Sequence, residues 1–61
     1  MTEKEQFVAL RRKKKIRLRR IAEYLSCSIS LLSRYERDDC FMDEEKIIKY
    51  KNFINNFVPE N

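Results

Sequence analysis

The stretch "LRRIAEYLSCSISLLSRYER", residues 18–37, decides the fold of this chain. Four apolar residues in its first half follow the i, i+3, i+4, i+7 spacing of one helix face: Leu18, Ile21, Ala22 and Leu25. The "SCS" that follows interrupts this pattern, because serine side chains compete for backbone hydrogen bonds and favour helix caps. Ser28 is a suitable N-cap for a further helix. The stretch therefore predicts a helix at about 17–25, a short turn, and a second helix at about 28–36.

Two short helices joined by so short a turn have the pattern of a helix-turn-helix. That geometry requires a small residue where the second helix crosses the first, and Ala22 satisfies it. It also requires apolar residues toward the core, and the sequence supplies five: Ile21, Leu25, Cys27, Leu32 and Tyr35. Either Leu31 or Leu32 can be the inward leucine of the second helix.

The flanking segments also read as helices. Thr2 and Glu5 fit a capping box, which predicts a helix over about 3–14. The stretch "RDDCFMD", residues 37–43, is polar and irregular and predicts a loop, and Asp43 is expected to cap a helix over about 43–57. We therefore predict one all-α domain over residues 1–61, a compact bundle of four or five short helices.

The amino-acid composition argues against several classes of function. The chain has 61 residues, no glycine, no histidine and no tryptophan. A domain this small has little room for a deep catalytic pocket, so we expect no enzyme activity, no cofactor and no metal site. Cys27 and Cys40 are expected to be reduced thiols in a cytosolic protein. No apolar run is long enough to cross a membrane, and we expect no membrane partner.

Charge is unevenly distributed along the chain. The net charge is +4, and residues 11–20, "RRKKKIRLRR", hold eight of the fourteen basic side chains. Because Ile16 and Leu18 are in phase with the neighbouring apolar stripes, we expect this run to be folded surface. A basic half in a small domain favours a polyanion partner, most often nucleic acid. A solvated surface that serves only solubility is the alternative reading.

At residues 18–37, and more broadly from Phe7 to Ile54, the sequence resembles the XRE family, the DNA-binding domains of Cro and phage-type repressors. The motif "IAEYLSCSISLLSRYER" is similar to the family signature. The resemblance implies a lambda-repressor-like fold and a cytoplasmic regulator of bacterial or phage origin, most often a repressor. It also implies a homodimer on a palindromic site in double-stranded DNA, and an ion pair between Arg11 and Glu36.

The sequence departs from the family in three places. Ser26 and Asp38 stand where the family usually has glycine, and both would need a left-handed backbone at some cost. Leu18 stands where the family often has a glutamine that touches phosphate. That contact would have to come from backbone N–H groups or from neighbouring arginines.

By the resemblance, the helix at 28–36 lies in the major groove. Base readout is expected from Ile29, Ser30, Ser33 and Arg34. Arg34 can grip guanine bidentately or, alternatively, contact phosphate or solvent. Ile29 either packs on a thymine methyl or is half-buried against the preceding helix. Phosphate contacts are expected from Lys14, Arg17, Arg19, Arg20, Ser28 and Arg37, with Lys13 and Lys15 on the same side of the domain.

The last third of the chain carries an apolar set that we expect to form a dimer or partner surface: Phe41, Met42, Phe53, Phe57 and Val58. The alternative is that Phe53 and Phe57 close the core where the family has a fifth helix. The same residues carry the main rival function. In that reading the protein binds another regulatory protein through Phe41, Phe53 and Phe57 and does not read DNA.

Overall fold

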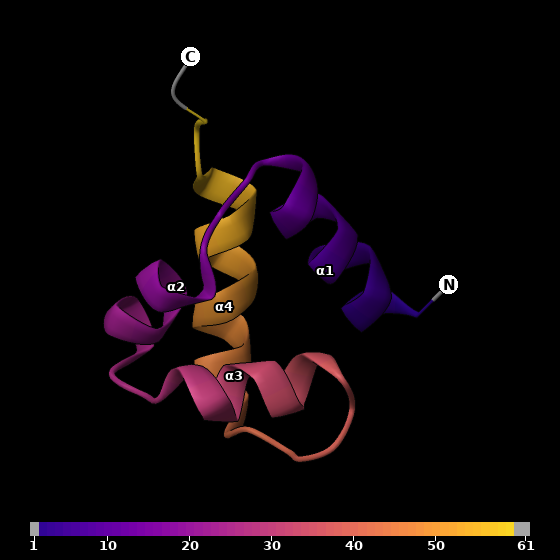
Figure 1. Ribbon diagram of the computed structural model, residues 1–61, viewed down its shortest axis with the longest axis vertical. Coiled ribbons are helices and arrows are strands. Elements are labelled where there is room, and N and C mark those ends of the chain that lie inside the picture. Colours follow the sequence, from indigo (N-terminus) through magenta and orange to yellow (C-terminus); the bar gives the residue numbers. More distant parts are fainter. Residues whose placement is uncertain (1, 60–61) are drawn as a thin grey trace.

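The computed structural model describes residues 2–59, so Met1, Glu60 and Asn61 of the predicted domain lie outside the described residues. Within this range the chain is all-helical and contains four helices. They are α1 (Glu3–Lys13), α2 (Leu18–Leu25), α3 (Ile29–Glu36) and α4 (Glu44–Asn56), as Figure 1 shows. Each helix begins and ends within one residue of its predicted range.

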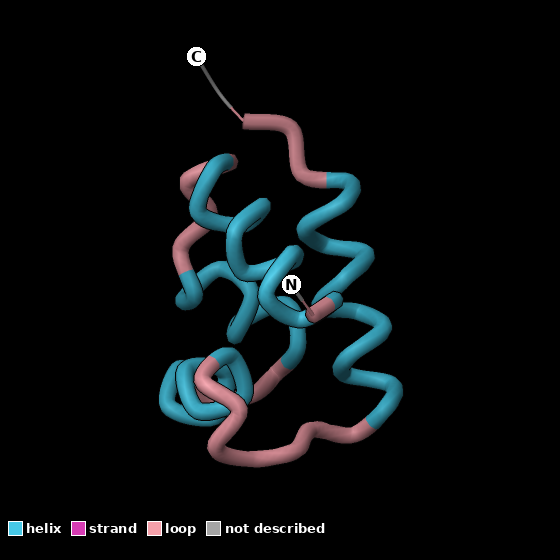
Figure 2. Tube along the Cα trace, turned by 90° about the vertical axis from the view of Figure 1, so that its right-hand side faces the viewer, coloured by secondary structure: helices cyan, strands magenta, loops and turns pink. Residues whose placement is uncertain are grey.

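Helix α4 runs along the long axis of the molecule, and the other three helices are arranged around it (Figure 1). Helices α1 and α2 lie on either side of it, and α3 lies across one end. Seen after a quarter turn in Figure 2, α3 is viewed nearly along its axis, and the loop after it passes beneath the bundle to reach α4. This loop comprises residues 37–43.

The core lies between α2, α3 and α4. Its buried residues are Ile16, Ile21, Ala22, Leu25, Leu32, Tyr35, Met42, Tyr50 and Ile54. Of the two candidate leucines in α3, Leu32 is fully buried and Leu31 is only half-buried. Helix α1 has no fully buried residue and packs on the core through half-buried Phe7 and Leu10. Its attachment therefore depends on polar contacts as well as on apolar burial.

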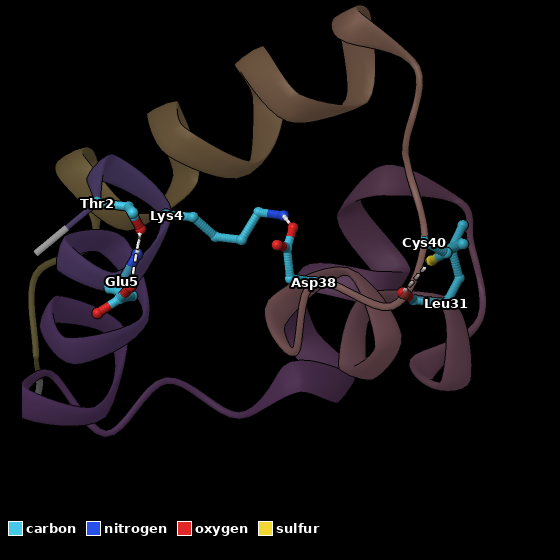
Figure 3. A network of polar contacts seen from close by, with 6 residues as sticks. All are labelled: Thr2, Lys4, Glu5, Leu31, Asp38 and Cys40. Atoms are coloured by element: carbon cyan, nitrogen blue, oxygen red, sulfur yellow. Dashed lines mark hydrogen bonds and ion pairs between the residues drawn. The ribbon is translucent and has the colours of Figure 1, made fainter.

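Side chains determine where two of the helices begin. The Thr2 hydroxyl accepts the backbone N–H of Glu5 at 3.2 Å and donates to the Glu5 carboxylate, so this end resembles the predicted capping box (Figure 3). Ser28 Oγ accepts the N–H of Leu31 at 3.0 Å. Our prediction that the Asp43 side chain caps α4 was wrong. Asp43 occupies the N-cap position of α4, but its carboxylate points toward Lys46 and accepts no backbone hydrogen bond.

Three helices end in a left-handed residue that is not glycine. Lys15 follows α1, Ser26 follows α2 and Asp38 follows α3, with φ angles of 58°, 58° and 66°. After each, the next residue's N–H bonds to a carbonyl five residues back, as when Cys27 N–H donates to Ala22 O at 3.0 Å. The chain has no glycine, so each turn carries the steric cost that a Cβ atom adds in this region.

None of the helices in the described part of the chain is both long and apolar enough to span a lipid bilayer.

Candidate nucleic-acid interface

Helix α3 presents one continuous outward stripe. Its members recur at i, i+1, i+4, i+5 and i+8: Ile29, Ser30, Ser33, Arg34 and Arg37. Leu32 and Tyr35 point the opposite way into the core. The stripe offers hydroxyl groups, two guanidinium groups and one apolar side chain, and it contains no carboxylate. Such groups suit base edges and phosphates, which together present acceptors, donors and thymine methyls.

Four of the five members of the stripe are exposed to solvent. Ile29 is 48% exposed, so about half of its surface is free to contact a partner. Ser30 and Arg34 are exposed, and Ser33 is half-buried. Ile29 and Ser30 lie in the first turn of α3, whereas Arg34 lies in the last turn. Arg34 therefore lies about one turn further along the helix than Ile29 and Ser30.

The turn between α2 and α3 fixes the direction of the stripe. It consists of Ser26 in the left-handed region, Cys27 and the N-cap Ser28. Cys27 is half-buried, and burial raises the pKa of its thiol. Ala22 is buried beneath this turn, and its carbonyl accepts the N–H of Cys27. A larger residue at position 22 would push α3 away from α2.

A partly buried polar network holds the C-terminal end of α3 on its inner side. Arg11 Nε lies 2.7 Å from Glu36 Oε2, and Arg11 Nη2 lies 2.9 Å from Glu36 Oε1. The third donor, Arg11 Nη1, binds the carbonyl of Ile16 at 2.9 Å. The side chains are 12% and 7% exposed, so this is a largely desolvated bidentate pair. It is the pair that the family resemblance implies.

Tyr50 adds a partner to this network that the sequence did not reveal. Its hydroxyl donates to Glu36 Oε2 at 2.7 Å, which ties α4 to the end of α3. Burial, and then the hydrogen bond to the Glu36 carboxylate, raise the pKa of Tyr50 far above its usual range. The ring packs edge-on against Tyr35, with centroids 5.5 Å apart. Spacing predicted only that Tyr50 faces inward, since a partner 14 residues away leaves no local pattern.

A second contact reaches α3 from the start of α1. Lys4 Nζ lies 2.7 Å from Asp38 Oδ1 (Figure 3). The same ammonium lies 4.3 Å from the centre of the Tyr35 ring. The hydrogen bond from Lys4, followed by its charge, lowers the pKa of Asp38. Figure 3 also shows Cys40 Sγ beside the Leu31 carbonyl, at 3.7 Å, which brings the following loop back onto α3.

The structure separates the basic run into engaged and free side chains. Arg11 is bound to Glu36, and the exposed Arg19 lies 3.3 Å from Glu23. Arg20 is exposed and stacks its guanidinium over the Phe57 ring at 5.6 Å. Other exposed basic side chains form no ion pair with a described residue: Arg12, Lys13, Lys15, Arg17 and Arg34. Arg37 lies 3.7 Å from Asp39 and stays 65% exposed.

Our assignment of Lys14 to phosphate is corrected by its contacts. Its ammonium donates to the carbonyls of Ile54, Asn55 and Phe57 at 2.7, 3.3 and 3.1 Å. These are the last carbonyls of α4, which lack partners in their own helix and favour a positive charge. The α1–α2 connection also begins at the end of the molecule away from α3 (Figure 1).

The predicted apolar surface does not form one patch. Met42 is 9% exposed and belongs to the core, so assigning it to a partner surface was wrong. Phe53 and Phe57 are half-buried and pack on the core, as the alternative reading expected. Phe41 is 96% exposed before α4, and Val58 is 80% exposed after it. The length of a 13-residue helix, about 20 Å, separates them.

Comparisons with models of protein families, with curated proteins and with solved structures each find no match to this chain. No family is therefore assigned, and the resemblance carried by residues 18–37 stays a prediction.

Proposed function

We propose that this protein is a sequence-specific regulator of transcription that binds double-stranded DNA. In this proposal α2 and α3 act as a helix-turn-helix of the lambda-repressor type, and α3 enters the major groove. The single observation that carries the proposal is the outward stripe of α3. Four of its five members are exposed, it contains no carboxylate and it ends in two arginines, while a partly buried ion pair fixes the helix from behind.

The proposed contacts divide into readout and positioning. Readout falls to Ile29, Ser30, Ser33 and Arg34, which share the stripe. Phosphate contacts fall to Arg17, Arg19, Arg20, Ser28 and Arg37. Arg17 supports this division, because it is the N-cap of α2, is exposed and has no carboxylate among the first-turn residues beside it. A helix start with that composition favours an anion.

The remaining parts of the proposal follow the family resemblance. The protein would act in the cytoplasm as a repressor of phage, plasmid or mobile-element type, as a homodimer on a palindromic operator. Two copies related by a twofold axis place their recognition helices about 34–36 Å apart, one turn of B-DNA. That spacing is a quantity that a selected DNA site reveals directly.

Selection from random DNA duplexes tests the proposal. Purified protein at about 150 mM salt would be incubated with the library, and bound duplexes sequenced over several rounds. An enriched palindrome with half-sites about 10 base pairs apart supports a dimeric regulator. Enrichment of nothing, with binding that disappears on adding salt, contradicts sequence-specific readout.

A protein partner is the rival function, and one observation favours it. Phe41 is 96% exposed in the loop before α4, on a chain whose other phenylalanines are half-buried. So exposed an aromatic ring offers a partner apolar contact area that the fold itself does not use. A failed DNA selection would move the search to partners that cover Phe41.

A further inference from the structure

Helix α1 is held to the domain differently from the other three helices. Every buried core residue of the described chain lies at or after Ile16, whereas α1 ends at Lys13. Helix α1 covers this core through Phe7 and Leu10, which are only half-buried. Between α1 and α3 lies an open hollow of about 260 Å³, lined by Glu5, Val8, Ala9, Arg12 and Glu36. Apolar packing therefore holds α1 less firmly than it holds α2, α3 and α4 together.

Charged groups supply the remaining contacts of α1. Three ion pairs join it to α3, to α4 and to the loop between them: Arg11 with Glu36, Glu3 with Lys51, and Lys4 with Asp38. Asp38 is 84% exposed and Glu3 is 66% exposed, and water weakens exposed pairs of this kind. The Arg11–Glu36 pair is largely desolvated, but separating α1 from α3 returns both charges to water, which offsets much of the lost attraction. Ion pairing therefore adds only moderately to the hold on α1.

Helix α1 also supports one end of α3. The backbone of α3 packs closely on α1 and α2, and it reaches α4 through side chains, among them Tyr50, whose hydroxyl binds Glu36. The turn from α2 fixes the N-terminal end of α3. The C-terminal end, where Arg34 and Arg37 lie, is fixed through Glu36, which Arg11 of α1 binds from the other side. Without α1, this end of α3 would keep only its contacts to α4 and α2.

The connection between α1 and α2 provides a pivot at the end of α1. Ile16 is 2% exposed, so the chain is anchored in the core three residues after α1 ends. The ammonium of Lys14 holds the same point to the last carbonyls of α4. Lys15, between the two, has a left-handed backbone with φ 58°. A rotation of α1 about this point leaves the buried residues of α2, α3 and α4 in place.

We propose that α1 opens as one unit about this pivot while α2, α3 and α4 stay folded, and that its closure fixes the C-terminal end of α3. Units of this kind open at a lower free energy than the whole domain when few buried apolar contacts hold them. The opening does not depend on the proposed function, but its consequence for DNA does. Because DNA would contact both ends of α3, bound DNA favours the closed state, and closure strengthens DNA binding to the same degree.

Native-state hydrogen exchange of the full chain, followed by NMR without DNA, tests the opening. After correction for intrinsic rates, the amides of residues 10–13 should exchange at least about tenfold faster than those of residues 50–54. Lys4→Met removes the ion pair at the far end of α1 and should accelerate exchange at residues 10–13 by about two- to fivefold. Fraying of the helix end alone would not respond to a change so far away.

Ile21→Val distinguishes opening of α1 from unfolding of the whole domain. Ile21 is fully buried in α2, which does not pack against α1 in the described structure. Losing one methyl group there should accelerate exchange at residues 50–54 by about two- to tenfold and leave residues 10–13 unchanged. Lys49→Met is the matched control for Lys4→Met, because it removes the same charge from an exposed pair within α4. It should leave residues 10–13 unchanged.

Three results would overturn the proposal: equal exchange of the two segments in the wild type, equal acceleration of both by Ile21→Val, or no response of residues 10–13 to Lys4→Met. Exchange is then repeated with a duplex obtained by selection. Slower exchange of α1 on that duplex supports the coupling to DNA, and unaltered exchange refutes it. If the selection fails while α1 opens as predicted, only the proposed function is refuted, so the two failures are distinguishable.

Discussion

The hydroxyl of Tyr50 lies 2.7 Å from Oε2 of Glu36, the same oxygen that Arg11 Nε contacts. One carboxylate thereby joins α1, α3 and α4. A largely buried carboxylate needs several donors to offset the loss of its hydration, and here two side chains supply them. The hydrogen bonds of Glu36 to Arg11 and Tyr50 hold α3 in place as much as apolar packing does.

Replacing Tyr50 with phenylalanine should lower the free energy of unfolding by about 1.5–3 kcal/mol at neutral pH, because Glu36 loses one donor. The raised pKa of Tyr50 predicts how this difference depends on pH. The stabilisation is complete below pH about 10, where an unfolded tyrosine keeps its proton, and declines as pH rises above that value. Denaturant melts from pH 7 to 11 would measure both effects.

Tyr24→Phe is the control for Tyr50, since Tyr24 is 53% exposed and its hydroxyl makes no side-chain hydrogen bond among the described residues. It should leave stability nearly unchanged at each pH. If Tyr50→Phe and the wild type differed by a constant amount from pH 7 to 11, the pH argument would be refuted.

Lys14 is predicted to matter for folding and not for DNA. Lys14→Met removes a charge from the carbonyl end of α4 and should cost about 1–3 kcal/mol of stability. Lys13→Met is the matched control, because Lys13 is exposed and unpaired among the described residues, and it should stay within about 0.5 kcal/mol. Thermal melts of both proteins decide the matter. If the two variants were equally stable, Lys14 would not stabilise the carbonyl end of α4.

Ser26→Gly should stabilise the protein. A serine at φ 58° bears a steric cost of about 1–2 kcal/mol, part of which glycine's greater freedom in the unfolded chain offsets. We expect a net gain of about 0.5–1 kcal/mol, or several degrees in Tm for a domain of this size. Ser33→Gly, the same change inside α3, should instead destabilise by a similar amount. A loss of stability in Ser26→Gly would contradict the strain argument.

Two neighbouring residues in the α3–α4 loop should respond oppositely to truncation. Met42→Ala removes a core side chain and should cost about 2 kcal/mol or more. Phe41→Ala removes a larger side chain that is 96% exposed and should leave stability nearly unaltered. Urea titration compares them under one set of conditions. A destabilised Phe41→Ala protein would show that Phe41 packs against the domain in solution.

Substitutions of Arg34 and Arg17 should have different effects, because Arg34 is proposed to read bases and Arg17 to contact phosphate. Arg34→Ala should relax the preference at one base position by about 1–3 kcal/mol and so alter the selected site. Arg17→Ala should weaken all duplexes alike and reduce the salt dependence by about one phosphate contact. Repeating the selection with each variant provides the measurement. An unaltered preferred site for Arg34→Ala would show that the readout assignment is wrong.

The sequence predicted the helices well and the polar contacts poorly. Helix bounds follow from apolar spacing and serine caps, which are local signals within a few residues. Lys14 looked like one member of a basic run, because nothing near it in sequence indicates the carbonyls of residues 54–57 that it binds. Met42 looked exposed because a polar loop surrounds it, yet the chain turns it into the core.

The left-handed turns that follow α1, α2 and α3 show a different limit of prediction from sequence. Ser26 and Asp38 were recognised as left-handed only because a glycine is usual there in the family that the sequence resembles. Lys15 has the same geometry and gave no such signal. In a chain without glycine, the end of a helix is determined by where the next segment must go to reach the core, and that is a property of the whole fold.

The contact of Lys14 with the last turn of α4 also bears on when the protein acquires its fold. During synthesis α1 leaves the ribosome well before the carbonyls of residues 54–57, which its neighbour Lys14 binds. Helix α1 has no fully buried residue with which to dock early. Helix α1 therefore gains this contact only after residues 54–57 have been made and α4 has formed.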